Sequence, residues 1–317
     1  MKNILLLGGF GFIGTNLLKY IDSYCSEVYS VVVFDKLPMH PHGVTFDCVE
    51  KVYAGDFSDT MYLKSIFQNH KFDLVIHSLS TTVPSTSNNI RFDIESNLIP
   101  TIELLNLLVE FSVLDIIFIS SGGAIYGDSA YKIKHKETDN TYPMSSYGVV
   151  KLAIEKYLFQ YTSLYHLRPL ILRLSNPYGR YHYSTKQGIC NVALRSALQG
   201  DTFNVWGTGE AKKDYIFIDD FCDILFRLYA NSIHNRVLNV GSGCVLSINQ
   251  ILDEIKSLVP TFCWSYKEAS KFDISHFELD TLELNKIIGN YNFSTFGTGL
   301  DIVNKWLTHN KFIGTII

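Results

Sequence analysis

Short apolar runs alternate with longer amphipathic stretches through the first half of the chain. The apolar runs have the length of buried strands, and the stretches between them carry apolar residues at helical spacing. The runs expected to form strands are 4–7, 28–34, 52–54, 74–76, 116–120 and 170–174, and the expected helices are 12–23, 61–69, 97–112 and 147–165. Strands that alternate with helices of these lengths predict an α/β fold with a doubly wound parallel sheet.

The pattern changes after Asn176. Segments become shorter and richer in Gly, Tyr and His, and a single further core strand is expected near 237–240. We therefore expect residues 1–176 to form the main domain. Residues 177–317 should form mainly a smaller C-terminal lobe, with the segment near 237–240 returning to the main sheet.

Glycines interrupt the pattern where the first strand ends. Gly8, Gly11 and Gly14 follow the run 4–7, and helical character begins at Phe12 and Ile13. A turn this tight allows backbone N–H groups to approach a pyrophosphate at the start of a helix, where the helix dipole favours negative charge. The sequence therefore predicts a dinucleotide site, and the alternative is a glycine-rich turn that binds nothing.

An acidic residue, Asp35, ends the second expected strand. A carboxylate about 20 residues beyond such a glycine turn can accept hydrogen bonds from the adenosine ribose hydroxyls. It also repels a 2′-phosphate, which favours NAD over NADP. Lys36 provides the opposing argument, because its ammonium group could pair with that phosphate.

Tyr147 and Lys151 are four residues apart in an expected helix. This spacing puts both side chains on one helix face. A nearby ammonium group is expected to lower the pKa of the tyrosine, which would let it exchange a proton near neutral pH. The alternative is a surface tyrosine beside a solvated lysine.

The glycine spacing, with Gly11-Phe12-Ile13-Gly14 and Tyr147-x-x-x-Lys151, resembles the extended short-chain dehydrogenase/reductases. The similar branch is the NAD-dependent nucleotide-sugar epimerases and dehydratases. The resemblance implies a Rossmann domain at 1–176 that binds NAD, and a lobe at 177–317 that binds the nucleotide sugar. It implies catalytic and cofactor-binding roles for Tyr147 and Lys151. It further implies cofactor contacts from the glycine turn with Phe12 and Ile13, from Asp35, and from Asp56, Phe57, Leu79 and Pro177.

The chain departs from the family pattern before the tyrosine. The position that usually holds a substrate-binding Ser or Thr is Gly122, so the neighbouring Ser121 is expected to be the third catalytic residue and, with Gly122, to contact substrate. The similar 4,6-dehydratases carry an Asp-Glu pair where this chain has Gly123 and Ala124, and the decarboxylases carry Glu at the second of these. The absence of these acids argues against elimination of water and against decarboxylation. The family reaction that remains is oxidation and reduction at one carbon of the sugar.

The resemblance also implies a diphosphate site. Asn176 would contact the diphosphate, and Lys213 stands where the family usually has an arginine. The second family arginine, three residues before Asp273, is Ser270, which leaves Lys271 nearby. Lysine keeps the charge but lacks the two-pronged geometry of arginine, so a weaker grip on the diphosphate is expected.

Together these features lead us to expect epimerisation at C4 of a nucleotide sugar of the UDP-glucose or UDP-N-acetylglucosamine type, through a 4-keto intermediate. Two alternatives stay open. One is an NAD(P)H-dependent reductase of nucleotide 4-keto-6-deoxysugars, and the other is an inactive homologue that binds a nucleotide sugar.

The composition limits the partners and the compartment that can be expected for the protein. The net charge of −4 gives no reason to expect nucleic acid as a partner, and no apolar stretch approaches the roughly 20 residues of a membrane span. The N-terminal run reads as a core strand rather than a signal peptide. Scattered cysteines without a Cys-x-x-Cys pair favour free thiols in a reducing, cytoplasmic compartment. His40 and His42 lack further metal ligands nearby, so no metal site is expected.

A homodimer is expected from two helices. One carries Val150, Ile154 and Leu158, and the other carries Leu104, Leu107, Leu108 and Phe111. The resembling family commonly pairs these helices across a two-fold axis, and two-fold dimers are the commonest assembly. The alternative is that both apolar stripes pack on the chain's own sheet.

Overall fold

The computed structural model describes residues 1–317 except 85–86, 88, 128–133, 186, 269–275 and 311–317. The chain forms two compact units. Unit 1 comprises Met1–Ile125, Pro143–Arg173 and Leu225–Leu238. Unit 2 comprises Tyr126–Tyr142, Leu174–Ile224 and Asn239–Ile317.

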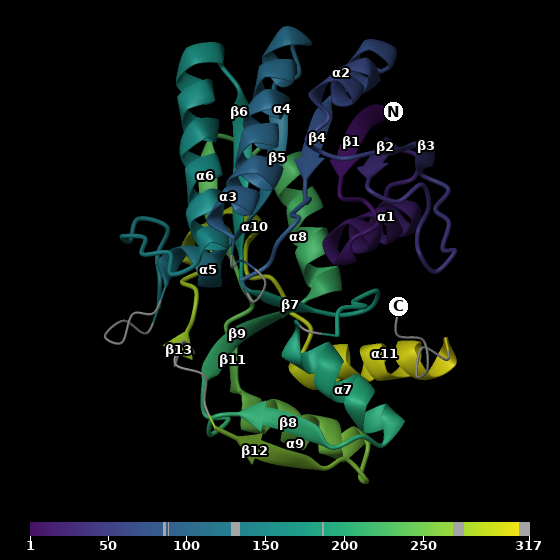
Figure 1. Cartoon of the computed structure of the whole chain (residues 1–317), viewed down its shortest axis with the longest axis vertical. Coiled ribbons are helices and arrows are strands. Elements are labelled where there is room, and N and C mark those ends of the chain that lie inside the picture. The colour runs from purple at the N-terminus through teal and green to yellow at the C-terminus, as the bar shows by residue number, and fades with distance from the viewer. Residues whose placement is uncertain (85–86, 88, 128–133, 186, 269–275, 311–317) are drawn as a thin grey trace. The chain divides into compact units, whose positions relative to one another are not determined.

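Unit 1 is built on a seven-stranded sheet with the strand order β10-β6-β5-β4-β1-β2-β3 (Figure 1). Its strands are β1 (Lys2–Leu7), β2 (Tyr29–Asp35), β3 (Val49–Ala54), β4 (Leu74–His77), β5 (Asp115–Ser121), β6 (Arg168–Leu174) and β10 (Arg236–Val240). The pairings of β1 with β2 and β4, of β2 with β3 and of β4 with β5 are parallel. The strand order reverses between β1 and β4, and ligands of such sheets bind at the carboxyl ends of the strands beside this reversal.

Helices cover both faces of this sheet (Figure 1). They are α1 (Phe12–Tyr24), α2 (Thr60–Asn69), α3 (Ile90–Asp93), the π-helical turn η1 (Ile94–Leu98), α4 (Ile99–Glu110), the short α5 (Gly122–Tyr126), α6 (Ser146–Tyr165) and α8 (Ile218–Ala230). Helices α2, α4 and α6 share one buried core with alternate residues of the strands, such as Leu5, Leu7 and Val75. Tyr20 of α1 stacks on Phe226 of α8 at a ring-centroid distance of 5.3 Å. The doubly wound α/β fold predicted from the sequence is confirmed.

The expected helix at 97–112 begins earlier than the sequence pattern indicates. Asn89 caps α3 by accepting a hydrogen bond from the Phe92 N–H at 3.0 Å, and the helical path then continues through η1 into α4. Side-chain capping of this kind satisfies a backbone donor that the helix itself leaves unpaired. The polar residues of η1 hide this start from a search for apolar periodicity.

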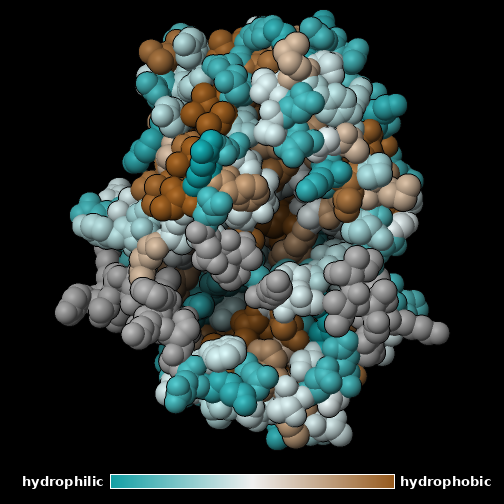
Figure 2. All heavy atoms as spheres, in the orientation of Figure 1, coloured by the Kyte–Doolittle hydropathy of each residue, from teal (hydrophilic) through white to brown (hydrophobic). Residues whose placement is uncertain are grey.

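The apolar stripes expected at a dimer interface are buried inside unit 1, so that part of the prediction is wrong. Val150, Ile154, Leu158, Leu104, Leu107 and Leu108 are each at most 4% exposed and lie in the core beneath α4 and α6, and Phe111 packs against the same core. Different apolar side chains are exposed on these helices, including Ile99 at 48% and Val149 at 51%. Figure 2 shows apolar side chains gathered over α6 and the neighbouring α4.

Unit 2 contains a smaller mixed sheet. Strand β9 (Lys212–Phe217) pairs in parallel with β7 (Asn176–Tyr178) and β13 (His276–Phe277), and antiparallel with β11 (Cys244–Ser247). Strands β8 (Phe203–Trp206) and β12 (Trp264–Lys267) form a separate parallel pair. The remaining helices are α7 (Ile189–Gln199), α9 (Ile248–Leu258), α10 (Leu282–Ile288) and α11 (Phe296–His309). These short strands, most of which the sequence pattern did not indicate, place Asn176 and Lys213 on β7 and β9.

Candidate active site

The glycine turn lies between β1 and α1 at the carboxyl edge of the unit 1 sheet. Gly8 has φ +79°, a left-handed conformation that glycine adopts without strain. A Cβ on Gly14 would lie 2.1 Å from the Gly8 carbonyl oxygen, so a larger residue cannot occupy this position without moving the turn. Gly11 is the N-cap of α1, which begins at Phe12 and Ile13. The turn thus brings backbone close to the start of a helix, as a bound pyrophosphate requires.

Asp35 is fixed beside this turn. Its Oδ2 accepts a hydrogen bond from the Phe10 N–H at 2.9 Å, and its Oδ1 accepts one from the Leu37 N–H at 3.2 Å. Leu79, which follows β4, lies against the turn, because a Cβ on Gly8 would meet the Leu79 Cα at 2.9 Å. The strand order therefore brings the glycines, Asp35 and Leu79 together at the carboxyl edge of the sheet, where the sequence predicts a dinucleotide.

Asp56 and Phe57 have structural roles in this part of unit 1. Ser58 donates backbone and side-chain hydrogen bonds to Asp56 Oδ1 at 2.9 and 2.6 Å. These bonds, with the nearby Lys36 charge, hold the pKa of Asp56 below its usual range. The Phe57 ring is 4% exposed and packs against the rings of Phe34 and His77. A cofactor contact from Phe57 therefore has to come from its backbone.

Helix α6 carries the candidate catalytic pair, Tyr147 and Lys151. The side chains of Tyr147 and Ser121 are hydrogen-bonded to one another, and the Lys151 Nζ lies 5.7 Å from the centre of the Tyr147 ring. Lys151 is 5% exposed, and its Nζ donates to the Ile119 carbonyl oxygen at 2.9 Å. The structure thus brings Ser121, at the end of β5, together with the tyrosine and lysine expected from the sequence.

The protonation of this pair differs from the expectation. Burial raises the pKa of Tyr147 to about 12, and the hydrogen bond with Ser121 lowers it only in part. Burial also lowers the pKa of Lys151 to about 8, although the nearby Glu155 carboxylate opposes this shift. The prediction that Lys151 lowers the tyrosine pKa is therefore wrong for the protein without cofactor, because removal from water raises that pKa and the group that lowers it in part is Ser121.

The start of α6 is held by two contacts that the sequence reasoning missed, one to Ser87 and one to Ala124. The Tyr147 N–H donates to Ser87 Oγ at 2.7 Å, and the Ser87 hydroxyl donates to the buried Asp93 Oδ2 at 2.5 Å. A Cβ on Gly148 would lie 2.3 Å from the Ala124 carbonyl oxygen, so α5 and α6 touch through their backbones. The signal for Gly148 was available in the sequence, since glycine is unfavourable inside a helix unless close packing requires it.

A buried ion pair anchors the next turn of α6. Glu155, one turn beyond Lys151, is 1% exposed, and Arg173 of β6 is 3% exposed. Arg173 donates from Nη2 to Glu155 Oε2 at 2.7 Å and from Nε to Oε1 at 3.1 Å, and Ser120 Oγ donates to the same Oε1 at 2.6 Å. Tyr147, Lys151 and Glu155 are spaced four apart, so this pair fixes the face of α6 that carries the reactive residues.

In unit 2, Asn176 and Lys213 lie on adjacent strands. The Asn176 side chain donates to the Asp214 carbonyl oxygen at 2.9 Å. Asp214 itself is 0% exposed, and burial raises its pKa to about 7. A Cβ on Gly241 would lie 2.3 Å from Asp214 Oδ2, so the carboxylate lies against the turn that follows β10. Pro177 follows Asn176 in β7, whereas Lys271 and Asp273 lie outside the described residues.

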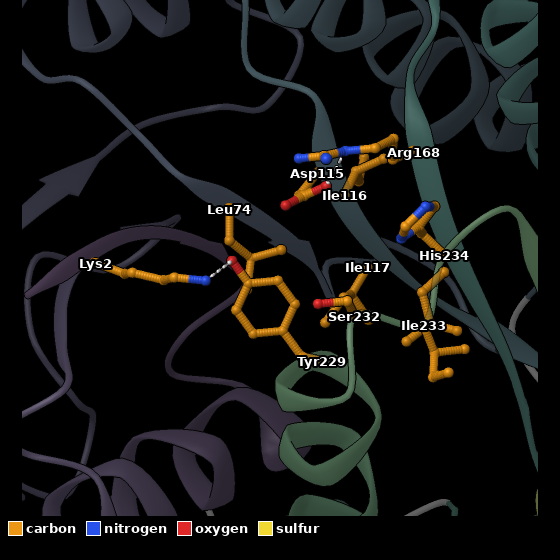
Figure 3. A pocket seen from close by; sticks show the side chains of 11 residues that line it. Lys2, Leu74, Asp115, Ile116, Ile117, Arg168, Tyr229, Ser232, Ile233 and His234 are labelled. Atoms are coloured by element: carbon orange, nitrogen blue, oxygen red, sulfur yellow. Dashed lines mark hydrogen bonds and ion pairs between the residues drawn. The ribbon is translucent and has the colours of Figure 1, made fainter. Parts of the chain in front are cut away.

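A separate cavity of about 230 Å³ lies at the opposite, amino-terminal edge of the unit 1 sheet (Figure 3). Its lining includes Lys2, Tyr229 and the ion pair between Asp115 and Arg168. The strands that carry the glycine turn and Ser121 point away from this edge, so the cavity is not the candidate active site. In the described part of the chain, no helix combines the length and apolar character needed to cross a membrane.

Comparison with known proteins agrees with this geometry. Residues 4–241 match the family model described as the NAD dependent epimerase/dehydratase family. The chain is 29% identical over 259 residues to a putative UDP-glucose 4-epimerase of Methanocaldococcus jannaschii, with 80% of this chain and 81% of that protein covered. It is also 29% identical over 258 residues to the dTDP-4-dehydro-6-deoxyglucose reductase of Escherichia coli, with the same coverage.

A solved structure extends the match to nearly the whole chain. The UDP-glucose 4-epimerase of Thermotoga maritima, determined with UDP-glucose, superposes with a TM-score of 0.87 at 26% identity, and covers 98% of this chain and 99% of its own. The glycine turn, the Tyr147–Lys151 pair and the family match over most of the sequence lead to one assignment: the chain belongs to the NAD dependent epimerase/dehydratase family.

Proposed function

We propose that the protein is an NAD-dependent 4-epimerase of a nucleotide sugar of the UDP-glucose or UDP-N-acetylglucosamine type. The observation that carries this proposal is the hydrogen-bonded Tyr147–Ser121 pair, with Lys151 behind it, in the same unit as the glycine turn. It is supported by the epimerases among the similar proteins. The residues after Ser121 also support it, since Gly123 and Ala124 offer neither acid nor base for elimination of water.

Each reactive residue has one task in this proposal. Tyr147 exchanges a proton with the 4-hydroxyl of the sugar, and the reaction passes through a 4-keto sugar. Ser121 donates a hydrogen bond to the reacting oxygen in the position that Gly122 cannot fill. Lys151 holds the nicotinamide ribose. NAD, when bound, supplies the oxidising power at C4 and recovers it within each cycle.

The raised pKa of Tyr147 sets a condition on this chemistry. With a pKa of about 12, the resting group is the neutral phenol, and a general base acts best when its pKa lies near the working pH. The hydrogen bond with Ser121 lowers that pKa, because it stabilises the phenolate. Because the Ser121 hydroxyl carries one proton, it donates either to the phenolate of Tyr147 or to the reacting oxygen at any one moment.

Candidate binding residues lie on each unit, and each set is assigned by itself. In unit 1, Asp35 receives the adenosine ribose and favours NAD over NADP, with the glycine turn, Phe12, Ile13, Asp56, the Phe57 backbone and Leu79 around the dinucleotide. For unit 2, the family resemblance gives Pro177 a role in cofactor binding and gives Asn176 and Lys213 roles in diphosphate binding.

A reductase of nucleotide 4-keto-6-deoxysugars is the second candidate. The specific observation in its favour is the equal identity, 29%, to the Escherichia coli reductase. The two activities use the cofactor differently. An epimerase regenerates NAD in every cycle, whereas a reductase consumes one reduced nicotinamide per product.

The decisive experiment incubates the purified protein, with no added cofactor, with UDP-glucose or UDP-N-acetylglucosamine. We expect the 4-epimer to appear by chromatography, and bound NAD to be released on denaturation. The matched variant Tyr147→Phe should retain NAD and lose turnover. Reduction of dTDP-4-dehydro-6-deoxyglucose that depends on added NADH or NADPH would establish the reductase instead, and no turnover in either assay would favour the inactive homologue.

A further inference from the structure

A buried histidine lies behind the reactive lysine. His77, the last residue of β4, is 2% exposed, and its ring packs against the rings of Phe57 and Phe118. Burial, with a smaller contribution from the Lys151 charge, lowers the pKa of His77 to about 3. The imidazole is therefore neutral at physiological pH, with one nitrogen as a donor and the other as an acceptor.

The hydrogen bonds of its neighbours assign the two nitrogens. His77 Nε2 lies 3.0 Å from Thr101 Oγ1, and the Thr101 hydroxyl donates its proton to the Asn97 carbonyl oxygen at 2.6 Å. Thr101 must therefore accept from Nε2–H, which leaves a lone pair on Nδ1. Among the described residues, no group donates to this buried lone pair. A buried acceptor without a donor destabilises the folded state, so a partner for Nδ1 is expected.

A small cavity adjoins this histidine. It has a volume of about 10 Å³, and its lining includes His77, Thr82, Tyr147 and Lys151. Thr82 Oγ1 is a second buried atom that finds no hydrogen-bond partner in the part of the chain that the structure describes. One water molecule needs a volume of roughly 10–15 Å³ and two to four polar partners, and this cavity offers both.

We propose that this cavity is a binding site for one water molecule, which joins His77 Nδ1 and the Thr82 hydroxyl to the Lys151 ammonium group and makes His77 a positioning residue for Lys151. The water donates to Nδ1, exchanges a hydrogen bond with Thr82, and accepts from Nζ. Ile119 takes one of the three N–H groups of Lys151. The water takes a second, and the third remains for the ribose of the cofactor.

The site matters because a lysine side chain is long and its ammonium group is not directional. Two fixed acceptors, the Ile119 carbonyl and the water, define where the remaining N–H points. The charged and titratable groups around Nζ are Tyr147 and Glu155 on α6 and His77 on β4, with Arg173 of β6 paired to Glu155. A neutral His77 holds the water that accepts from Lys151 Nζ. It does so without adding a second positive charge beside Lys151.

The water site is tested by diffraction, which needs no turnover. A crystal structure of the purified protein at a resolution that defines ordered water should show one water within 3.2 Å of His77 Nδ1, Thr82 Oγ1 and Lys151 Nζ. A cavity without density, or a water that contacts neither Nδ1 nor Nζ, would overturn the proposal. This result stands apart from the proposed epimerase activity, on which only the positioning role depends.

The positioning role is tested by two matched variants. His77→Asn keeps a polar atom near the place of Nδ1 and loses the bond to Thr101, whereas His77→Gln keeps a group near Nε2 and loses the atom at Nδ1. We expect kcat of His77→Asn within about threefold of the wild type, and kcat of His77→Gln to fall about tenfold.

Stability separates this role from simple packing. The bond to Thr101 is retained in His77→Gln, so this variant should have the higher unfolding temperature and the lower kcat. If kcat follows stability in both variants, His77 acts only through the fold and the positioning role is refuted. The reverse order of kcat and stability supports it.

Discussion

The buried pair of Glu155 and Arg173 offers a quantitative test of how α6 is held. Both side chains are almost fully buried, and the guanidinium group binds both carboxylate oxygens. Replacing either residue alone, in Glu155→Leu or Arg173→Met, leaves an unpaired charge inside the core. Such a change costs about 3–5 kcal/mol of the free energy of unfolding. We expect each single variant to lose this amount.

The double variant should recover most of this loss. A buried pair replaced on both sides by apolar residues of similar volume is often neutral or stabilising, because neither charge remains to be desolvated. Ser120 still loses its acceptor, which costs about 1–3 kcal/mol. The double variant should therefore be slightly less stable than the wild type and clearly more stable than either single variant.

Urea unfolding followed by circular dichroism, at one protein concentration and without cofactor, measures these differences. The exposed pair of Lys64 and Glu110 provides the control, since Glu110→Gln should cost no more than about 1 kcal/mol. Single losses that add in the double variant would refute the reasoning, because additivity would mean that the two side chains do not depend on each other. Single losses as small as that of the control would also refute it.

Four further outcomes are expected. Gly14→Ala should abolish NAD binding measured by titration, because the added Cβ would collide with the Gly8 carbonyl; unchanged affinity would show that the turn can open. Cofactor-free protein should bind NADP more weakly than NAD, and equal affinities would remove Asp35 from the selectivity argument. Glu155→Gln removes the carboxylate that raises the pKa of Lys151, so that pKa should fall below about 8. The alkaline limb of the pH dependence of kcat/KM should then move to lower pH. An unmoved limb would show that it does not report the ionisation of Lys151. Light scattering should give a dimer mass that Val149→Glu halves and the exposed Met61→Glu on α2 leaves unchanged; a monomeric wild type would refute the dimer.

The elements that the sequence predicted well are those whose pattern is local. The glycine turn, the strands of unit 1 and the Tyr147–Lys151 spacing each depend on residues within one or two turns of the chain, where periodicity and backbone freedom are decisive. The position of Ser121, the expected third catalytic residue, could also be predicted, because the apolar run had already located the end of the strand that precedes it. The structure places it in contact with Tyr147.

The predictions that failed depend on which part of the protein packs against a helix or strand, and this is not visible in the local sequence. The stripe with Val150 and Ile154 is apolar whether it faces a sheet or a second subunit, so amphipathicity could not decide between them. The pKa of Tyr147 depends on burial, which adjacent residues in sequence do not reveal. The contact of Ser87 with the Tyr147 N–H joins segments 60 residues apart, and no periodicity records such a pairing.

The backbone contact between Gly148 and Ala124 has a consequence for how the reaction specificity of this scaffold can change. Because the main chain of α5 meets the main chain of α6, the placement of Tyr147 does not depend on which side chains occupy positions 123 and 124. Both positions are partly exposed to solvent. New acids or bases can therefore be introduced there while the tyrosine stays in place. The chemistry can therefore be altered by substitution at positions 123 and 124, without rebuilding the helix that carries Tyr147, the residue proposed for proton transfer.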